Sequence, residues 1–264
     1  KSQAHAAKAL ELRNSAQQIV LDAMGLAGWM PSDPLTYSVR STEVFGGGRI
    51  DAQYFRPRYL EVEQKLLETG ADVRLAKMVS KNTRGRQPVY QEAGLPVINS
   101  RHVRTNRVVL RGNRSGLLAG SPVTIQNGDV LLNGTGVGTI GRAAPFLHDA
   151  EALPDNHVTV LRPQGIDPVY LSVFLNSPLG QMQIERHIKG SSGQIEIYPR
   201  DLDDIRVWDA PKDVQESVRA ALMTSFTEEA LGRSAENEAL NDLVSAITDS
   251  PITDQPSKAF DGVI

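Results

Sequence analysis

A glycine-rich stretch is the first part of this chain whose residue types and spacing could do chemistry. Residues 128–146 read GDVLLNGTGVGTIGRAAPF and contain a G-x-G-x-x-G pattern at Gly136, Gly138 and Gly141. This pattern binds a dinucleotide where a strand leads into the glycines and a helix N-terminus follows them. The apolar run at 130–132 predicts the strand, but Pro145 comes too soon for a helix. A nucleotide-binding enzyme that uses Gly136 to Gly141 is therefore only an alternative interpretation.

Other catalytic patterns are missing from the sequence. The chain has no cysteine, which excludes disulfides, thiol catalysis and cysteine-bound zinc. Its five histidines lack metal-ligand spacing, and no nucleophile elbow occurs. The FGGGR at 45–49 is not accompanied by the other motifs of a DNA methyltransferase. We predict a non-catalytic protein that holds neither a metal nor a cofactor of its own.

The charge of the chain is unevenly distributed. The net charge is -3, but residues 81–114 hold eight basic residues and only one acidic residue, Glu92. The basic residues are Lys81, Arg84, Arg86, Arg101, Arg104, Arg107, Arg111 and Arg114. Arginine has a planar fork of N–H donors that suits phosphates and guanine edges. The segment indicates either a nucleic-acid surface or a solvated face of a sheet.

Helical periodicity dominates the two ends of the chain. Apolar residues recur at helical spacing between Leu12 and Met24, and Gly25 provides a stop. A second helix is predicted from Pro57 to Thr69, with Tyr59, Val62, Leu66 and Leu67 on one face. A long helix is predicted to start near Pro211, with Asp209 as its cap. Its apolar stripe consists of Val218, Leu222, Phe226, Leu240, Val244 and Ile247.

The middle of the chain has a β-rich texture. Short apolar runs bounded by turn residues predict strands at 95–100, 107–110, 121–125, 129–133 and 156–163. Two short helices are predicted across 168–188, because Asp167 and Ser177 are good caps and each precedes a proline.

These elements define a mixed α/β (α+β) fold class. We expect a β-rich domain with a small helical insert, flanked by long amphipathic helices that pack as an antiparallel or coiled-coil pair. The predicted organisation is an N-terminal helix (1–28), a surface linker (29–48), the β-rich domain (49–209), a long helix (210–248) and a disordered tail (249–264).

Three motifs in this order resemble the specificity (S) subunit of type I restriction-modification systems. GDVLLNGTGVGTIGRAAPF is similar to the strand and Gly-Thr-Ile-Gly-Arg loop of that family. LPDNHVTVLRP with DPVYLSVFLNS resembles its next strand and helix. IKGSSGQIEIYPRDLDDIRV with APKDVQESV resembles its final loop, strand and conserved helix. The resemblance spans residues 128–218, and the order of elements extends it to the whole chain.

The resemblance implies a bacterial, cytoplasmic protein that recognises a double-stranded DNA sequence and stays clear of the membrane. It implies DNA methyltransferase (modification) subunits and a restriction/translocase subunit as partners, which would hold S-adenosylmethionine, ATP and Mg²⁺. A full S subunit has two recognition domains, and this chain has room for one. It would be a fragment, a half-subunit that forms a homodimer through its long helices and reads a palindrome, or part of a fused restriction-methylation enzyme.

Candidate DNA-binding residues lie in polar loops that follow or precede the predicted strands. Arginine can pair with guanine and asparagine with adenine, whereas lysine and serine can follow phosphates. For the glycine loop, turn geometry is the competing interpretation. The candidates are Arg84, Arg86, Asn99, Ser100, Arg101, His102, Arg104, Asn133, Thr135, Thr139, Arg142, Asn156, His157, Lys189, Ser191, Ser192, Gln194 and Arg200.

Overall fold

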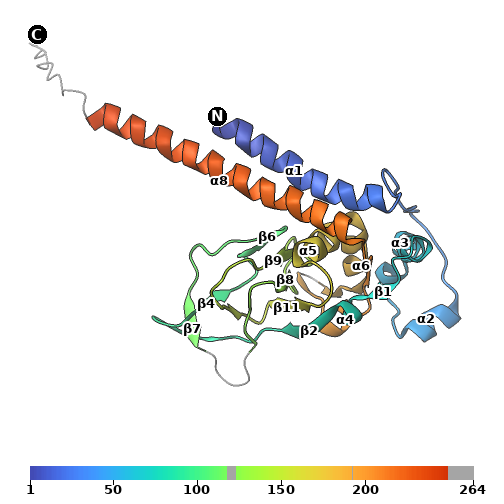
Figure 1. The fold of residues 1–264 in the computed structure, drawn as a ribbon. Coiled ribbons are helices and arrows are strands. Elements are labelled where there is room, and N and C mark those ends of the chain that lie inside the picture. The colour runs from blue at the N-terminus through green and yellow to red at the C-terminus, as the bar shows by residue number, and fades with distance from the viewer. Residues whose placement is uncertain (118–122, 192, 249–264) are drawn as a thin grey trace, which may run out of the picture. The chain divides into compact units, whose positions relative to one another are not determined.

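The protein is described by a computed structural model that covers residues 1–117, 123–191 and 193–248. Figure 1 shows the elements along the chain, a mixture of helices and strands that confirms the predicted α+β class. The chain divides into two compact units, one made of Lys1–Leu12 with the chain from Met223 onward and the other of Arg13–Leu222. Ser192 and the predicted tail at 249–264 lie outside the described residues.

The first unit contains the start of α1 (Ser2–Ala23) and most of α8 (Lys212–Thr248). The Ser2 hydroxyl donates to Glu236 at 2.5 Å, and His5 Nδ1 lies 2.7 Å from Glu228 Oε2. As the residue number rises along α1, its partner's number falls along α8. The two helices are therefore antiparallel within this unit.

The apolar stripe predicted along α8 is only partly buried. Val218 and Leu222 are fully buried, but Leu240 and Val244 are more than half exposed. The side chain of Ile247 is not described. Leu240 and Val244 lie beyond Glu236, the α8 residue that Ser2 at the start of α1 contacts.

The start of α8 also differs slightly from the prediction. The carbonyl of Pro211 accepts hydrogen bonds from the N–H groups of Val214 and Gln215, both at 3.1 Å. An N-cap residue is the one whose carbonyl accepts the first helical bond, so Pro211 occupies this position and not Asp209. At the other end of the chain, Gly25 has a φ of 68° and ends α1 as predicted.

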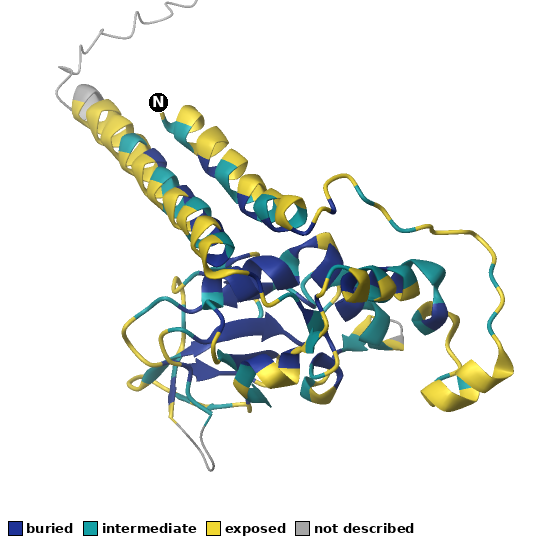
Figure 2. Cartoon of the chain, turned by 45° about the vertical axis from the view of Figure 1, so that its right-hand side comes forward, coloured by how far each residue is buried: buried dark blue, intermediate teal, exposed yellow. Residues whose placement is uncertain are grey.

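A four-stranded antiparallel sheet forms the centre of the second unit. Its strand order is β2 (Val79–Arg84), β11 (Val158–Pro163), β8 (Val130–Asn133) and β9 (Ala143–Pro145). Every residue of β8 and β9 is buried, as the dark blue strands in Figure 2 show. Helix α5 (Pro168–Asn176) packs against β8 and β9. This helix is buried almost all round, which is why its sequence is so apolar.

A second four-stranded sheet has the order β10 (Leu153–Pro154), β4 (Leu95–Ile98), β7 (Ser115–Leu117) and β3 (Val89–Gln91). Three two-stranded pairs complete the β structure. They are β1 (Val73–Arg74) with β14 (Arg206–Val207), β5 (Val103–Arg104) with β6 (Arg107–Val108), and β12 (Lys189–Ser191) with β13 (Gln194–Glu196).

Most predicted elements of this unit are confirmed. Strands occur within 95–100, 129–133 and 156–163, and α6 (Pro178–His187) follows α5. The Asp167 carboxylate accepts from the N–H of Val169 and Tyr170, and Ser177 accepts from Gly180. Further helices are α3 (Pro57–Glu68), α4 (Leu75–Met78), α7 (Pro199–Leu202) and the 3-10 helix η1 (Ala52–Phe55).

Two strand predictions and one helix face need correction. Residues 121 and 122 are not described, and of the rest of 121–125 only Ile125 pairs, in an isolated bridge with Ala152. The run at 107–110 is shortened to two residues because it turns back directly onto β5. On α3, Leu67 is 46% exposed because it lies beside the buried stripe of Tyr59, Val62 and Leu66.

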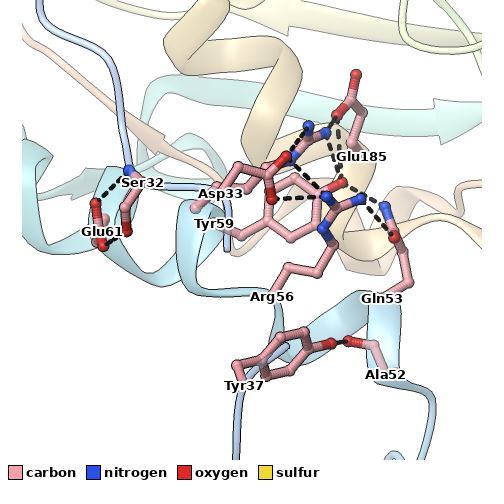
Figure 3. Close-up of polar contacts among 10 residues, drawn as sticks. Ser32, Asp33, Tyr37, Ala52, Gln53, Arg56, Tyr59, Glu61 and Glu185 are labelled. Carbon is pink, nitrogen blue, oxygen red and sulfur yellow. Dashed lines mark hydrogen bonds and ion pairs between the residues drawn. The ribbon is translucent and has the colours of Figure 1, made fainter. Parts of the chain in front are cut away.

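The predicted linker is partly structured. Residues 41–47 form helix α2 (Ser41–Gly47), which has no buried residue and carries the exposed Phe45. Figure 3 shows how the part before α2 is held on the domain. The backbone N–H of Ser32 donates to Glu61 at 2.8 Å, and Arg56 Nη2 donates to both carboxylate oxygens of Asp33 at 2.6 and 2.7 Å. The Tyr37 hydroxyl donates to the carbonyl of Ala52.

Among the described residues, no helix combines the length and the apolar character that crossing a membrane requires.

Candidate nucleic-acid interface

Three strands of the central sheet end at the same edge. The β2 residue Arg84 pairs with Thr159, and the β8 residue Asn133 pairs with Val158. Because the sheet is antiparallel, the C-terminal ends of β2 and β8 and the N-terminal end of β11 meet there. The loops that follow or precede these ends contain the candidates Arg86, Thr135, Asn156 and His157, of which Arg86, Asn156 and His157 are exposed.

Main-chain hydrogen bonds tie the loops of this edge together. The N–H of Gly134 donates to the carbonyl of His157 at 2.8 Å, and the N–H of Ile197 donates to the carbonyl of Gly134 at 3.0 Å. Thr135 Oγ1 lies 2.8 Å from His157 Nδ1. The loop after β13 therefore shares a framework with the loops after β8 and before β11.

Arg84 supports these loops through hydrogen bonds to their main chain. Its guanidinium donates to the carbonyls of Gly134 and Ile197, and its side chain is 17% exposed. A Cβ atom at residue 134 would overlap Arg84 Nη2, so any other residue there would have to displace the guanidinium. Arg84 was predicted as a DNA contact, but its two bonds to carbonyls give it a supporting position.

The glycine-rich loop is a compact turn. Gly136, Gly138 and Gly141 have φ values of 96°, 73° and 81°, a left-handed region that favours glycine. Thr139 Oγ1 donates to the carbonyls of Thr135 and Gly136, both at 3.2 Å. The chain then enters strand β9, so a strand and not a helix follows the glycines. This geometry supports the turn interpretation and lacks the phosphate cradle of a dinucleotide site.

Arg142 follows the glycine loop and points along it. Its Nη2 donates to the carbonyl of Gly138 at 2.6 Å. It also lines a cavity of about 440 Å³ together with Gln181, Glu185 and Ile188 of the α6 region. The predicted contact Arg142 is therefore half-buried and partly engaged within the chain.

The polar residues after β4 fall into two groups. His102 is 2% exposed, and its Nδ1 accepts from the backbone N–H of Asn99 at 3.1 Å. Burial and the nearby Arg101 and Arg104 lower the pKa of His102, so this imidazole is favoured in its neutral form. Arg101 and Arg104 are exposed. The buried histidine therefore shapes the turn that presents the two arginines.

Asn133 connects this turn to the sheet edge. It is fully buried, and its Nδ2 donates to the carbonyl of Ser100 at 3.0 Å. An amide in this position cannot reach a groove of DNA without leaving its pocket. Asn133 was predicted as a contact, and the structure places its side chain as a support of the Ser100 loop.

The last candidate loop carries a mixture of free and engaged side chains. Lys189 Nζ lies 2.5 Å from Asp201 Oδ1, whereas Gln194 and Arg200 are exposed. The side chain of Ser191 is not described, and Ser192 lies outside the described residues.

The basic segment 81–114 presents most of its charge to solvent. Five of its eight basic residues are exposed, and none of the five forms an ion pair among the described residues. These are Arg86, Arg101, Arg104, Arg111 and Arg114. Arg114 stacks on Tyr90, with its Cζ 3.5 Å from the ring centroid. An exposed cation without a carboxylate partner keeps its charge available for an anionic ligand.

A buried amide network behind the glycine loop was not predicted from the sequence. Asn176 Nδ2 donates to Asn106 Oδ1 at 2.6 Å and to the carbonyl of Ala143 at 2.7 Å. The Ser172 hydroxyl donates to the same Asn106 oxygen at 2.8 Å. Asn106 has a φ of 58° in the tight turn between β5 and β6. Asparagine in a short hairpin loop is a known sign of this conformation, so the turn could have been predicted.

No group of three or more possible metal ligands occurs within the described ranges.

Comparisons with known proteins give matches only among solved structures. No family model matches the chain, and no curated protein matches it. The chain is similar to the HsdS subunit from Thermoanaerobacter tengcongensis, with 17% identity and a TM-score of 0.45 over 94% of this chain and 55% of that one. It is also similar to the type I restriction-modification S subunit from M. genitalium, with 10% identity and a TM-score of 0.45 over 93% of this chain and 56% of that one.

The chain thus spans about half the length of these structures. Both are S subunits, the family that the motifs of the sequence resemble.

Proposed function

We propose that this chain recognises a specific sequence of double-stranded DNA, as a specificity subunit or half-subunit of a type I restriction-modification complex. The observation that carries the proposal is the set of five exposed arginines in 86–114 that have no carboxylate partner among the described residues. Phosphate and guanine edges are the partners that arginine prefers on DNA. The order of the three family motifs independently supports the same role.

Affinity and specificity come from different side chains in this proposal. The exposed arginines supply salt-dependent attraction to phosphates, which does not depend on sequence. Arg101, Asn156 and His157 are exposed and lie at or near loops that are fixed by hydrogen bonds. Side chains on fixed loops suit base reading, because their donors and acceptors are held in one position.

The partners are part of the same proposal. Methyltransferase subunits and a restriction/translocase subunit would bind S-adenosylmethionine, ATP and Mg²⁺, and this chain would carry out no chemistry itself. A homodimer through the long helices would place two recognition domains on a palindrome. A recognition part of a fused enzyme would read one half-site in the same way.

Selection of bound sequences from a random DNA duplex pool, at roughly physiological salt, tests the proposal. We expect enrichment of a short motif. Retention of DNA without any motif would contradict sequence recognition, and a palindrome with a fixed spacer would indicate the dimer. Calorimetry with NAD, ATP and S-adenosylmethionine tests the nucleotide alternative, and heat from any of them would favour it.

Two variants sharpen the selection. If Arg101 reads a base, Arg101→Ala should reduce discrimination at one or two base pairs by about 1 to 3 kcal/mol. If Arg101 touches phosphate, Arg101→Ala should weaken binding to every duplex equally. The matched control is Arg74→Ala, which removes an exposed arginine that is already paired with Asp204 and should leave the motif unchanged.

A further inference from the structure

Tyr198 stands out as an exposed aromatic ring surrounded by cations. It lies between β13 and α7, and its side chain is 39% exposed. Arg84 Cζ lies 5.4 Å from the ring centroid, Arg200 Cζ lies 5.7 Å from it, and Lys189 Nζ lies 5.8 Å from it. The negative face of an aromatic ring attracts cations at these distances.

The main chain fixes the position of this tyrosine. The N–H of Tyr198 donates to Asp201 Oδ2 at 3.2 Å, and the carbonyl of Tyr198 accepts from the N–H of Asp201 at 2.9 Å. The preceding residue, Ile197, donates to the carbonyl of Gly134. The main chain of Tyr198 is therefore held beside the edge of the central sheet.

The three cations around the ring differ in what else they contact. Arg84 donates to two carbonyls and lies 3.9 Å from Glu196, and Lys189 is paired with Asp201. Arg200 is exposed and forms no ion pair with any described residue. Two carboxylates, Glu196 and Asp201, thus face three cations, and the charge that remains belongs to Arg200.

A guanidinium near an aromatic face keeps its N–H donors for another partner. The attraction to the ring acts on the face of the planar group, whereas the five N–H donors point outward in its plane. A phosphodiester oxygen pair accepts such donors in a bidentate manner. Arg200 beside Tyr198 therefore suits a phosphate better than the backbone-bonded Arg84 does.

We propose that Arg200 contacts a backbone phosphodiester of the bound DNA and that Tyr198 is the positioning residue that holds its guanidinium for this contact. The inference rests on the proposed DNA-recognition function and adds a contact whose effect is independent of base sequence. Because Ile197 joins the loop of Tyr198 to Gly134, this phosphate lies next to the sheet edge that carries Thr135 and His157.

The salt dependence of DNA binding tests this assignment. One lost phosphate contact lowers the slope of log K against log salt by about 0.9. We expect Arg200→Ala to lower the slope by about this amount and to weaken all duplexes by one common factor. Tyr198→Leu removes the ring face and should lower the slope in the same direction. Tyr198→Phe keeps the face and should retain the slope of the unchanged protein.

Matched controls separate this effect from misfolding and from general loss of charge. Arg74→Ala removes an exposed arginine that is paired with Asp204, and its slope should not change. The urea midpoint of each variant shows whether it folds like the unchanged protein. Inorganic phosphate, compared with sodium chloride at equal ionic strength, should not compete further with DNA.

Each opposite result would overturn the assignment. An unchanged slope in Arg200→Ala would remove the phosphate contact, and a loss confined to particular sequences would make Arg200 a base reader. The positioning role of the ring would be removed if Tyr198→Leu kept the salt slope of the unchanged protein. It would also be removed if Tyr198→Phe lowered that slope. Competition by inorganic phosphate would assign the site to a free anion. If the unchanged protein bound no DNA, the proposed function itself would fail.

Discussion

Two regions of the second unit use arginine in opposite ways. On and before α3 and on α6, arginines face carboxylates. Arg56 pairs with Asp33, Arg58 with Glu185, and Arg186 with Glu63. In the segment 86–114, five arginines are exposed and lack such partners among the described residues. The same residue type thus holds helices and the linker together in one region and leaves positive charge at the surface in the other.

The difference shows that pairing, and not the number of arginines, separates structural charge from charge that is free for a ligand. A half-buried guanidinium that loses its carboxylate leaves unpaired groups behind, which is costly. An exposed arginine without a partner can be removed at little cost to the fold.

Arg186→Ala should destabilise the protein by about 3 kcal/mol. The Arg186 side chain is 13% exposed, donates to Glu63 and to the carbonyl of Tyr54 at 3.2 Å, and lies 4.5 Å from the Tyr54 ring centroid. Urea unfolding measures the loss. The matched variant Arg86→Ala should change stability by less than about 0.5 kcal/mol, and equal losses in both variants would remove the distinction between the regions.

Replacement of Arg104 and Arg111 by serine should weaken DNA binding about tenfold, or about 1.4 kcal/mol, and lower the salt slope by about 1.8. Both residues are exposed and unpaired with any described carboxylate. The urea midpoint should stay almost unchanged, because both side chains are exposed. Undiminished DNA affinity would show that this segment is only a solvated surface.

Asp33→Asn should loosen the linker, and the free energy that holds the linker on the domain should fall by about 1 kcal/mol or less. Asp33 accepts both of its hydrogen bonds from Arg56, at the part of the linker shown in Figure 3. Limited digestion with trypsin should cut after the exposed Arg40 faster in this variant. Asp72→Asn, which removes an exposed carboxylate elsewhere, should leave the cutting rate unchanged. A rate that stays the same in Asp33→Asn would mean that other contacts hold the segment.

The smallest expected effect is a pH dependence from Asp155. Burial raises the pKa of this carboxyl, although it accepts from the N–H of His157 at 2.9 Å. Its protonated form is favoured in the folded state, so its contribution to stability is fully present below the unfolded pKa of about 3.9 and is lost as pH rises through the folded pKa. Asp155→Asn should remove this contribution.

Urea midpoints of the unchanged protein and of Asp155→Asn, compared between pH 4 and 7, measure the difference. We expect the variant to gain stability relative to the unchanged protein as pH rises. Parallel curves would show that the buried carboxyl titrates as it does in the unfolded chain.

The fold was predictable where local chemistry decides the structure. Asp167 and Ser177 cap their helices because each side chain reaches the N–H groups of its own helix. The strands at β4, β8 and β11 follow from short apolar runs between turn residues. Which part of the α8 stripe is buried was not predictable, because a periodic pattern does not reveal which residues another helix covers.

The candidate site was predictable by position but not by role. Arg84 and Arg104 are the same residue type in one basic segment, yet Arg84 bonds to two carbonyls and Arg104 is exposed. His102 and Asn133 are polar residues that the fold buries as supports of the loops. These roles depend on contacts between residues far apart in the sequence, which no local pattern contains.

The hydrogen bonds from the Arg84 guanidinium to the carbonyls of Gly134 and Ile197 form a clamp, and this clamp also affects the order of folding. It joins residue 84 to carbonyls that lie 50 and 113 positions later in the chain. Contacts across such separations form only after long loops have closed, so this clamp is expected to be absent from the transition state. Substitution of Arg84 should then accelerate unfolding and leave the refolding rate almost unchanged. The loops of the candidate interface would be the last part of the sheet edge to form during folding and the first to open during unfolding.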